Sequence, residues 1–330
     1  MQTRAYRDGR KVADGFAIEE VSERRAGGDG DGGDLLWIGL TPDDGTSLGA
    51  LADELGLHPL AVEDVAERGQ RVKLDRYSDH LFLSMYTLTP VGGSKGHGFT
   101  VRGLTAFVLP DVLVTVADEG FDMPDVLAAW DSHPDLVRCG VGGLVWALLD
   151  VVVDSHLDAA QRLDDRLEKV EETILTADHD QRHAQRATFR AHKDVAVLRR
   201  YALPMREILD TLAHGDGGLA GVDSEELAPY YRDVDDHVLR VMGWTDALRD
   251  IATTLLDANL TVQSNRMNLA MKKVTSWAAI IAVPTLVTGV YGMNVQYPLF
   301  GTVLGWWVGA ALITAPPVVL YSLFKKNDWL

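Results

Sequence analysis

The sequence predicts an α/β N-terminal domain, followed by a long helical stalk and two C-terminal transmembrane helices. Three observations support this prediction. Short apolar runs of strand type, bounded by turn residues, recur within the first 143 residues. After Pro229 no proline occurs until Pro284, so one uninterrupted helix can extend through that segment. No Asp, Glu, Lys, Arg or His occurs between Val274 and Phe324, a stretch long enough for two membrane spans of about 20 residues each.

Residues 1–143 are expected to form the α/β domain, on the cytoplasmic side of the membrane. Strands are expected where β-branched and aromatic residues cluster between turn residues, at 35–40, 81–88, 105–109 and 112–116. Helices are expected at 48–55, at 126–132 and from 141 onward. The Gly/Asp-rich segment from Gly27 to Gly33 is expected to be a flexible linker, because it lacks the ligand spacing of a calcium loop.

Residues 144–224 are expected to form a cytoplasmic helical hairpin. Dense charge at helical spacing predicts a first helix over 156–177. A second helix is expected over 180–213, with Pro204 as a kink or break, because proline cannot continue the hydrogen bonding of a helix.

Residues 225–293 are expected to form one stalk helix that continues into the first membrane span. At 1.5 Å per residue such a helix would be roughly 100 Å long. It must therefore pack against copies of itself or against the two preceding helices. The packing seam is a set of apolar residues at helical spacing: Val234, Val238, Val241, Leu248, Ala252 and Leu255.

The first span is expected at about 274–292 and the second at 303–324, joined by a short outer loop at 294–302. Lys272-Lys273 precede the first span, and Lys325-Lys326 follow the second in a basic tail of residues 325–330. Positive charge favours the cytoplasmic side, so both termini are expected there. Two spans per chain cannot enclose a pore, so a conducting pathway requires a ring of subunits.

The charge balance restricts the class of ligand. The 330-residue chain carries 48 Asp and Glu against 31 Lys and Arg, a formal net charge of −17. Nucleic-acid binding relies on Lys and Arg contacts to phosphate, so this balance argues against such a partner. An acidic surface concentrates cations, although acidity also serves solubility alone. The single cysteine excludes a Cys-rich metal site, and no catalytic motif supports an enzyme.

The chain resembles the CorA family of magnesium and cobalt transporters, which is marked by a Gly-Met-Asn (GMN) motif. The matching segments extend over nearly the whole sequence: His58 to Val65, Arg232 to His237, Lys272-Lys273, Tyr291-Gly292-Met293-Asn294 and Lys325 to Leu330. The resemblance implies a CorA-like homopentameric funnel in the cytoplasmic (inner) membrane. Such a channel would move Mg²⁺ across the lipid bilayer, with Co²⁺ and Ni²⁺ as further permeant ions.

The selectivity filter is expected at Gly292, Met293 and Asn294. Mg²⁺ loses its water reluctantly, so a filter for it should hold the hydrated ion through neutral dipoles. A ring of Asn294 side-chain oxygens can accept hydrogen bonds from those waters, and the Gly292 carbonyl can add a dipole. The alternative role of Asn294 is a helix cap.

Further pore-lining residues are expected on one face of the first span. Thr285 would offer a hydroxyl group to the hydrated ion. Val274 and Met271 would form an apolar constriction that gates by dewetting. The alternative is ordinary helix packing, for which small residues are common in membranes. The whole predicted set comprises Thr285, Ala282, Ala278, Val274 and Met271.

Two acids are expected to bind metal on the cytoplasmic side. The carboxylates of an Asp257 ring would repel one another unless the ring held cations. The resemblance implies a second, regulatory site at Asp233, at which bound Mg²⁺ holds the channel shut. The chain departs from the family in two places. Thr89 stands where the family often has the partner acid, and the outer loop Val295 to Gly301 contains no acid.

Two alternatives remain open at this point. Zinc-transporting relatives share the triplet, so the permeant ion could be Zn²⁺, with or without proton coupling. A non-conducting, membrane-anchored cation sensor or scaffold is the alternative of a different class. The triplet and the polar Thr285 argue against the sensor, because an anchor needs neither.

Overall fold

The computed structural model describes residues 1–27, 33–67, 69–91, 98–176, 181–214, 225–293 and 299–329. They form two compact units, Met1–Leu255 and Leu256–Leu330. The expected linker near Gly27 falls mostly outside the described residues, as do Asn294 and the following four residues of the outer loop.

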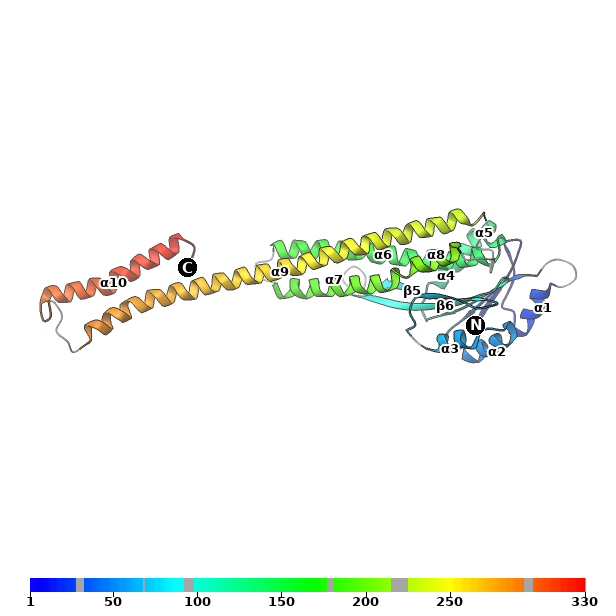
Figure 1. Ribbon diagram of the computed structural model, residues 1–330, viewed down its shortest axis with the longest axis horizontal. Coiled ribbons are helices and arrows are strands. Elements are labelled where there is room, and N and C mark those ends of the chain that lie inside the picture. The colour runs from blue at the N-terminus through cyan, green and yellow to red at the C-terminus, as the bar shows by residue number, and fades with distance from the viewer. Residues whose placement is uncertain are drawn as a thin grey trace. The chain divides into compact units, whose positions relative to one another are not determined.

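The first unit contains a seven-stranded mixed sheet in the order β2-β1-β3-β7-β6-β5-β4. Figure 1 labels two neighbouring strands of this sheet, β5 and β6. Strands β3 and β7 run parallel, and the other neighbouring pairs of this sheet run antiparallel. The strands are β1 (Gln2–Arg7), β2 (Arg10–Asp14), β3 (Leu35–Leu40), β4 (Lys73–Arg76), β5 (Leu81–Pro90), β6 (Phe99–Val108) and β7 (Val112–Ala117).

The expected strands at 35–40, 81–88 and 112–116 are confirmed as β3, β5 and β7, while β6 begins six residues earlier than expected. Sequence patterning missed β1, β2 and β4. Strands β2 and β4 are the two edges of the sheet. Edge strands carry charged residues that prevent pairing with other chains, and this composition hides the apolar pattern of a strand.

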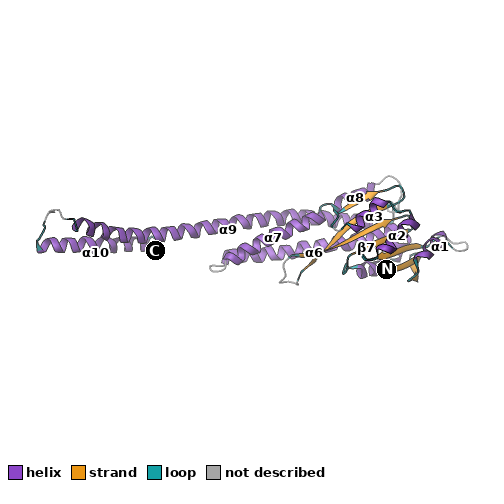
Figure 2. Cartoon of the chain, turned by 90° about the horizontal axis from the view of Figure 1, so that it is seen from below, coloured by secondary structure: helices purple, strands orange, loops and turns teal. Residues whose placement is uncertain are grey.

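Helices cover both faces of the sheet. On one face lie α2 (Gly45–Leu55) and α3 (Pro59–Ala66), which share an apolar cluster with Ile38, Phe82 and Phe107 (Figure 2). On the other face lie α4 (Met123–Ser132), α5 (Pro134–Arg138) and the first part of α6 (Val141–Thr176). A 3₁₀ turn (Ile18–Glu20) and α1 (Val21–Ala26) follow β2 in the chain.

Beyond the sheet, α6 packs with α7 (Gln181–Ala202) and with the N-terminal part of α9 (Ala228–Tyr291). The expected seam of α9 is buried, and its second half contacts α6 and α7, the two preceding helices. The expected break at Pro204 is confirmed, because α7 ends at Ala202 and α8 (Met205–His214) follows. The helix expected from 141 onward is confirmed as the start of α6, which runs without interruption through the segment expected as a separate first hairpin helix at 156–177.

The second unit contains the C-terminal part of α9 and α10 (Val303–Lys326). Both helices are long and apolar enough to cross a membrane. Trp277 and Tyr321 pair across them with ring centroids 6.4 Å apart, and Lys272 lies 6.0 Å from the Trp329 ring. Pro284 lies inside α9, and Pro316 and Pro317 lie inside α10.

His156 joins α6 to the sheet. Its side chain is buried, and Nε2–H donates to the Tyr86 carbonyl of β5 at 2.8 Å. Burial lowers the pKa of His156 to about 4, from 6.5, although this hydrogen bond partly opposes the shift. Because the unfolded chain takes up the proton near pH 6.5, the contribution of neutral His156 is complete at pH 7. It is lost as the pH falls from about 6.5 towards 4.

We therefore expect the titration of His156 to lower the free energy of unfolding of the full-length protein by about 2 kcal/mol between pH 7 and pH 5. A His156→Gln variant keeps an N–H donor but does not titrate, so its stability should fall less over this range. Thermal unfolding at several pH values measures the difference. His192→Gln, on a partly buried position of α7, is the matched control. Equal pH dependence of the wild-type and His156→Gln proteins would contradict the expectation.

Candidate functional site

The predicted filter follows directly from the end of α9. The helix ends at Tyr291, and the Gly292 N–H still donates to the Thr288 carbonyl at 2.8 Å. The Met293 N–H then donates to the Val290 carbonyl at 3.2 Å, a tighter turn of three residues. Met293 is more than half exposed. Gly292 and Met293 thus lie at the end of the helix, whereas Asn294 lies outside the described residues.

The five predicted pore-lining residues lie on an exposed face of α9. Met271 is 60% exposed and Val274 is 65% exposed, and Ala278, Ala282 and Thr285 are also exposed. The less exposed positions of the same segment include Ser276, Val283, Val287 and Tyr291, which recur on the other side of the helix. Within one chain, therefore, these five residues have no covering element among those described.

Hydroxyl groups near the end of α9 are oriented by backbone carbonyls. Thr285 Oγ1 donates to the Ile281 carbonyl at 2.8 Å, and Thr288 Oγ1 lies 3.0 Å from the carbonyls of Pro284 and Thr285. Because its proton is engaged in the helix, the Thr285 hydroxyl has lone pairs to offer. It can accept a hydrogen bond from the water shell of a cation.

The structure brings Asp233 together with residues that sequence reasoning had not selected. Carboxylate oxygens of Asp150 and Asp233 and a ring nitrogen of His237 all lie within 4.8 Å of one another. Asp150 comes from α6, and the other two come from successive turns of α9. The buried Tyr231 hydroxyl donates to the Gly142 carbonyl at 2.9 Å, which holds this part of α9 against the start of α6. We call Asp150, Asp233 and His237 the α6–α9 cluster.

Negative charge dominates the α6–α9 cluster. Burial and the neighbouring Asp154 carboxylate raise the pKa of Asp150 to about 6. Burial also raises the pKa of Asp154, and His237 opposes that shift from 3.5 Å. His237 Nδ1 is buried and has no hydrogen-bond partner within the described part of the chain. Three carboxylates near one imidazole form a set of oxygen and nitrogen donors that can hold a divalent cation.

Two further positions singled out in the sequence lie outside the α6–α9 cluster: Asp257, the other predicted metal ligand, and Thr89, which stands where the family often has an acid. Asp257 is exposed on α9, within the second unit, and is not part of the α6–α9 cluster. Thr89 is partly buried on β5, opposite Thr100 of β6. The preceding residue, Leu88, donates its N–H to Ser155 Oγ on α6 at 3.2 Å. The end of β5 therefore reaches the part of α6 that carries Asp154.

The sequence contained one pattern that points to Asp150, Asp154 and His237, which were not predicted as metal ligands. Asp150 and Asp154 are four residues apart, as are Asp233 and His237, so each pair occupies one face of its helix. Two such pairs on different helices indicate a metal site only if the helices pack in the matching register. That register depends on contacts distant in sequence, such as Tyr231 with Gly142.

Known proteins resemble this chain over most of its length. The profile of a family described as "CorA-like Mg2+ transporter protein" matches residues 32–326. The "Cobalt/magnesium transport protein CorA" of Thermotoga maritima is 27% identical over 306 residues, covering 89% of this chain and 83% of that protein. The "Putative metal ion transporter YfjQ" of Bacillus subtilis is 25% identical over 297 residues, covering 89% of each.

Two solved structures share the fold of the whole chain. The structure titled as the complete CorA magnesium transporter from Methanocaldococcus jannaschii superposes with a TM-score of 0.75 at 17% identity. The full-length CmaX protein superposes with a TM-score of 0.69 at 20% identity. Each comparison covers 100% of this chain and 98% of the other.

Proposed function

Since the chain belongs to the family of CorA-like Mg²⁺ transporters, we propose that it conducts hydrated Mg²⁺ through a pore lined by α9. It is a divalent-cation transporter of two membrane spans and not an enzyme. A Zn²⁺ substrate is not favoured, because the matched family is one of Mg²⁺ transporters. The observation that supports our pathway is the uncovered face of α9 from Met271 to Thr285, which leads to Gly292 and Met293.

In the proposed assembly five copies surround one axis in the cytoplasmic membrane, with both termini in the cytoplasm. The exposed face of α9 then meets its equivalents in the other copies. Ions meet Asn294 and the Gly292 carbonyls first, and pass Thr285 and then the apolar residues Val274 and Met271. A membrane potential of 100 mV drives each divalent ion inward with about 4.6 kcal/mol. Co²⁺ and Ni²⁺, of the same charge, are the expected further permeant ions.

Transport by the purified full-length chain in liposomes tests this function. The liposomes contain a Mg²⁺-sensitive dye, and an inside-negative potential drives entry. We expect Mg²⁺ influx, competition by external Co²⁺, and weaker competition by Zn²⁺. The same measurement with and without a proton gradient examines proton coupling. A protein that assembles but passes no Mg²⁺ would overturn the proposal in favour of a sensor or scaffold.

We further propose that the α6–α9 cluster is the regulatory metal site. Thr89 supplies no carboxylate at the position expected from the family, while Asp150 supplies one from α6, close to Asp233. A bound divalent cation would neutralise carboxylates that otherwise repel one another across the two helices. Tighter cation binding to the closed channel than to the open one would then keep the channel closed when the cytosolic Mg²⁺ concentration is high.

Loss of the cluster should release the channel from this inhibition. In Asp233→Ala we expect roughly tenfold higher influx at millimolar internal Mg²⁺. This change corresponds to losing about 1.4 kcal/mol of the free energy by which the bound metal favours the closed state. At low internal Mg²⁺ the variant and the wild type should conduct alike. Asp236→Ala removes an exposed acid from the same helix and is the matched control. Unchanged inhibition in both Asp233→Ala and His237→Gln would remove the cluster from regulation.

A further inference from the structure

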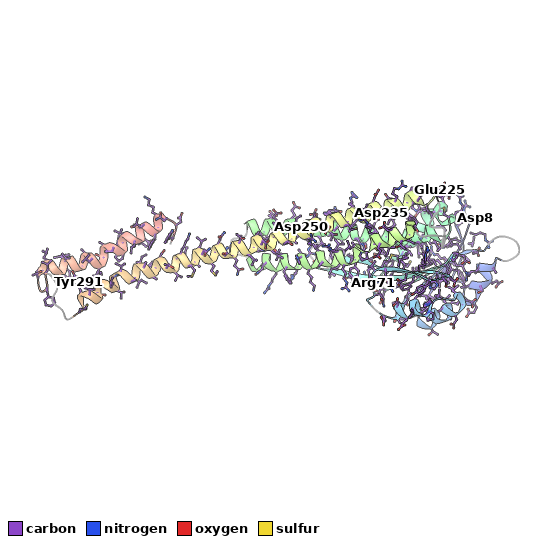
Figure 3. All side chains as sticks on the ribbon, viewed as in Figure 1. Asp8, Arg71, Glu225, Asp235, Asp250 and Tyr291 are labelled. Atoms are coloured by element: carbon purple, nitrogen blue, oxygen red, sulfur yellow. The ribbon has the colours of Figure 1, made fainter. Side chains whose placement is uncertain are left out.

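The residues on either side of the predicted filter both contact one face of α10. Tyr291 directly precedes the triplet, and Leu299 follows the loop that begins with it. Figure 3 marks Tyr291 at the end of α9. Their contact points on α10 are Gly305 and Gly309, one turn apart and both buried. These two residues are called the glycine face of α10.

Gly309 is required by the ring of Tyr291. A Cβ atom placed on Gly309 would lie 2.9 Å from Tyr291 Cε1 and 3.3 Å from Cδ1. Carbon atoms in contact are normally separated by about 3.5–4.0 Å. A side chain at position 309 would therefore require the Tyr291 ring, at the end of α9, to shift away from α10.

Gly305 is required by the backbone of Leu299. A Cβ atom on Gly305 would lie 2.3 Å from the Leu299 carbonyl oxygen. That oxygen also accepts hydrogen bonds from Thr302 N–H at 3.2 Å and from Thr302 Oγ1 at 2.8 Å. Thr302 Oγ1 in turn accepts from the Gly305 N–H at 3.1 Å. The backbone of Leu299 is thus held at the first turn of α10.

The conformation of Leu299 shows how closely this end of the loop is specified. Its φ of 72° lies in the left-handed region, which is unfavourable for a residue with a branched side chain. Such a conformation persists only where the surroundings impose it. Among the described residues, the contacts of Leu299 with Thr302 and the space left by Gly305 supply such surroundings.

We propose that Gly305 and Gly309 are positioning residues for ion selection: they hold both ends of the segment that carries Gly292, Met293 and Asn294 against α10. The inference rests on the proposed filter. A site that discriminates between ions of equal charge depends on the placement of its dipoles, so displacement of either end alters discrimination. Small residues also permit close helix contact, but packing alone does not predict a change in ion preference.

Ion competition in liposomes separates positioning from packing. The ratio of Mg²⁺ to Co²⁺ influx is measured per assembled full-length protein for Gly305→Ala, Gly309→Ala and Ala311→Val. Ala311 is exposed two residues from Gly309 and so lies on the opposite side of α10. We expect the ratio to change at least about threefold in the two glycine variants and to stay unchanged in Ala311→Val. Wild-type ratios in the assembled glycine variants would overturn the proposal.

A double-mutant cycle then tests whether Gly309 acts through Tyr291. Tyr291→Ala removes the ring that a methyl group on residue 309 would strike. Adding Gly309→Ala to that variant should therefore cause no further change in the ratio, while independent effects would add. Additive changes would overturn the proposed contact. The Asn294→Ala variant distinguishes failure of the filter proposal from failure of this inference. If Asn294→Ala still conducts Mg²⁺, the filter proposal fails. If Asn294→Ala is blocked and the glycine variants keep the wild-type ratio, only this inference is overturned.

Discussion

Asn294→Ala should abolish Mg²⁺ influx into dye-loaded liposomes while the protein still assembles. The substitution removes the amide oxygens that are proposed to accept hydrogen bonds from the water shell of the ion. In the proposed ring of five copies, five acceptors would be lost together. Mg²⁺ cannot compensate by shedding its waters, because it dehydrates reluctantly. The remaining Gly292 carbonyls do not supply side-chain amide dipoles at that level of the pore.

Two controls make this result specific. Assembly is checked by size-exclusion chromatography in detergent, since Asn294 could also cap the helix and its loss would then affect folding. Asn294→Gln keeps the amide on a longer side chain, so it should conduct with an altered preference between Mg²⁺ and Co²⁺. Wild-type influx through an assembled Asn294→Ala channel would exclude Asn294 from the filter.

Met271→Asn should produce a channel that leaks when the wild type is shut. Met271 is 60% exposed on α9 and, with Val274, forms the proposed apolar constriction. A narrow apolar ring excludes water, and therefore ions, without closing sterically. In the proposed pentamer, the amide groups of the five copies would keep the constriction wet. At millimolar internal Mg²⁺ we expect influx about tenfold above that of the wild type, equivalent to a shift of about 1.4 kcal/mol between the two states.

Leu269→Asn is the matched control for this leak. Leu269 is also exposed, but it lies two residues from Met271 and so about 200° around the helix. The same polar group on that side of α9 should leave influx at the wild-type level. If Met271→Asn stays shut at high internal Mg²⁺, or if Leu269→Asn leaks equally, the constriction is not at Met271.

Most of the helical architecture was predictable because its signals are local. The uncharged stretch from Val274 to Phe324 indicated two spans, and the structure contains α10 and the C-terminal part of α9 there. The seam of α9 was read from periodicity alone and is buried. Pro204 predicted the break between α7 and α8, because the residue itself cannot continue a helix.

The sheet was predictable only in its interior. Strands such as β3 and β7 are apolar because both of their faces are covered, so their composition reveals them. The edge strands β2 and β4 are charged, and their pairing depends on neighbours rather than on their own residues. Their existence was therefore decided by tertiary structure.

The sequence by itself determined that this chain has two membrane spans, an uninterrupted stalk helix and a Gly-Met-Asn triplet at the end of the first span. Each of these is written in consecutive residues or in a short repeat. Only the tertiary structure decided that Asp150 joins Asp233 and His237, and that Gly305 and Gly309 contact Leu299 and Tyr291. Such contacts depend on the register of packed helices and on the path of the outer loop. Both are set by the sum of many distant interactions, so no local pattern contains them.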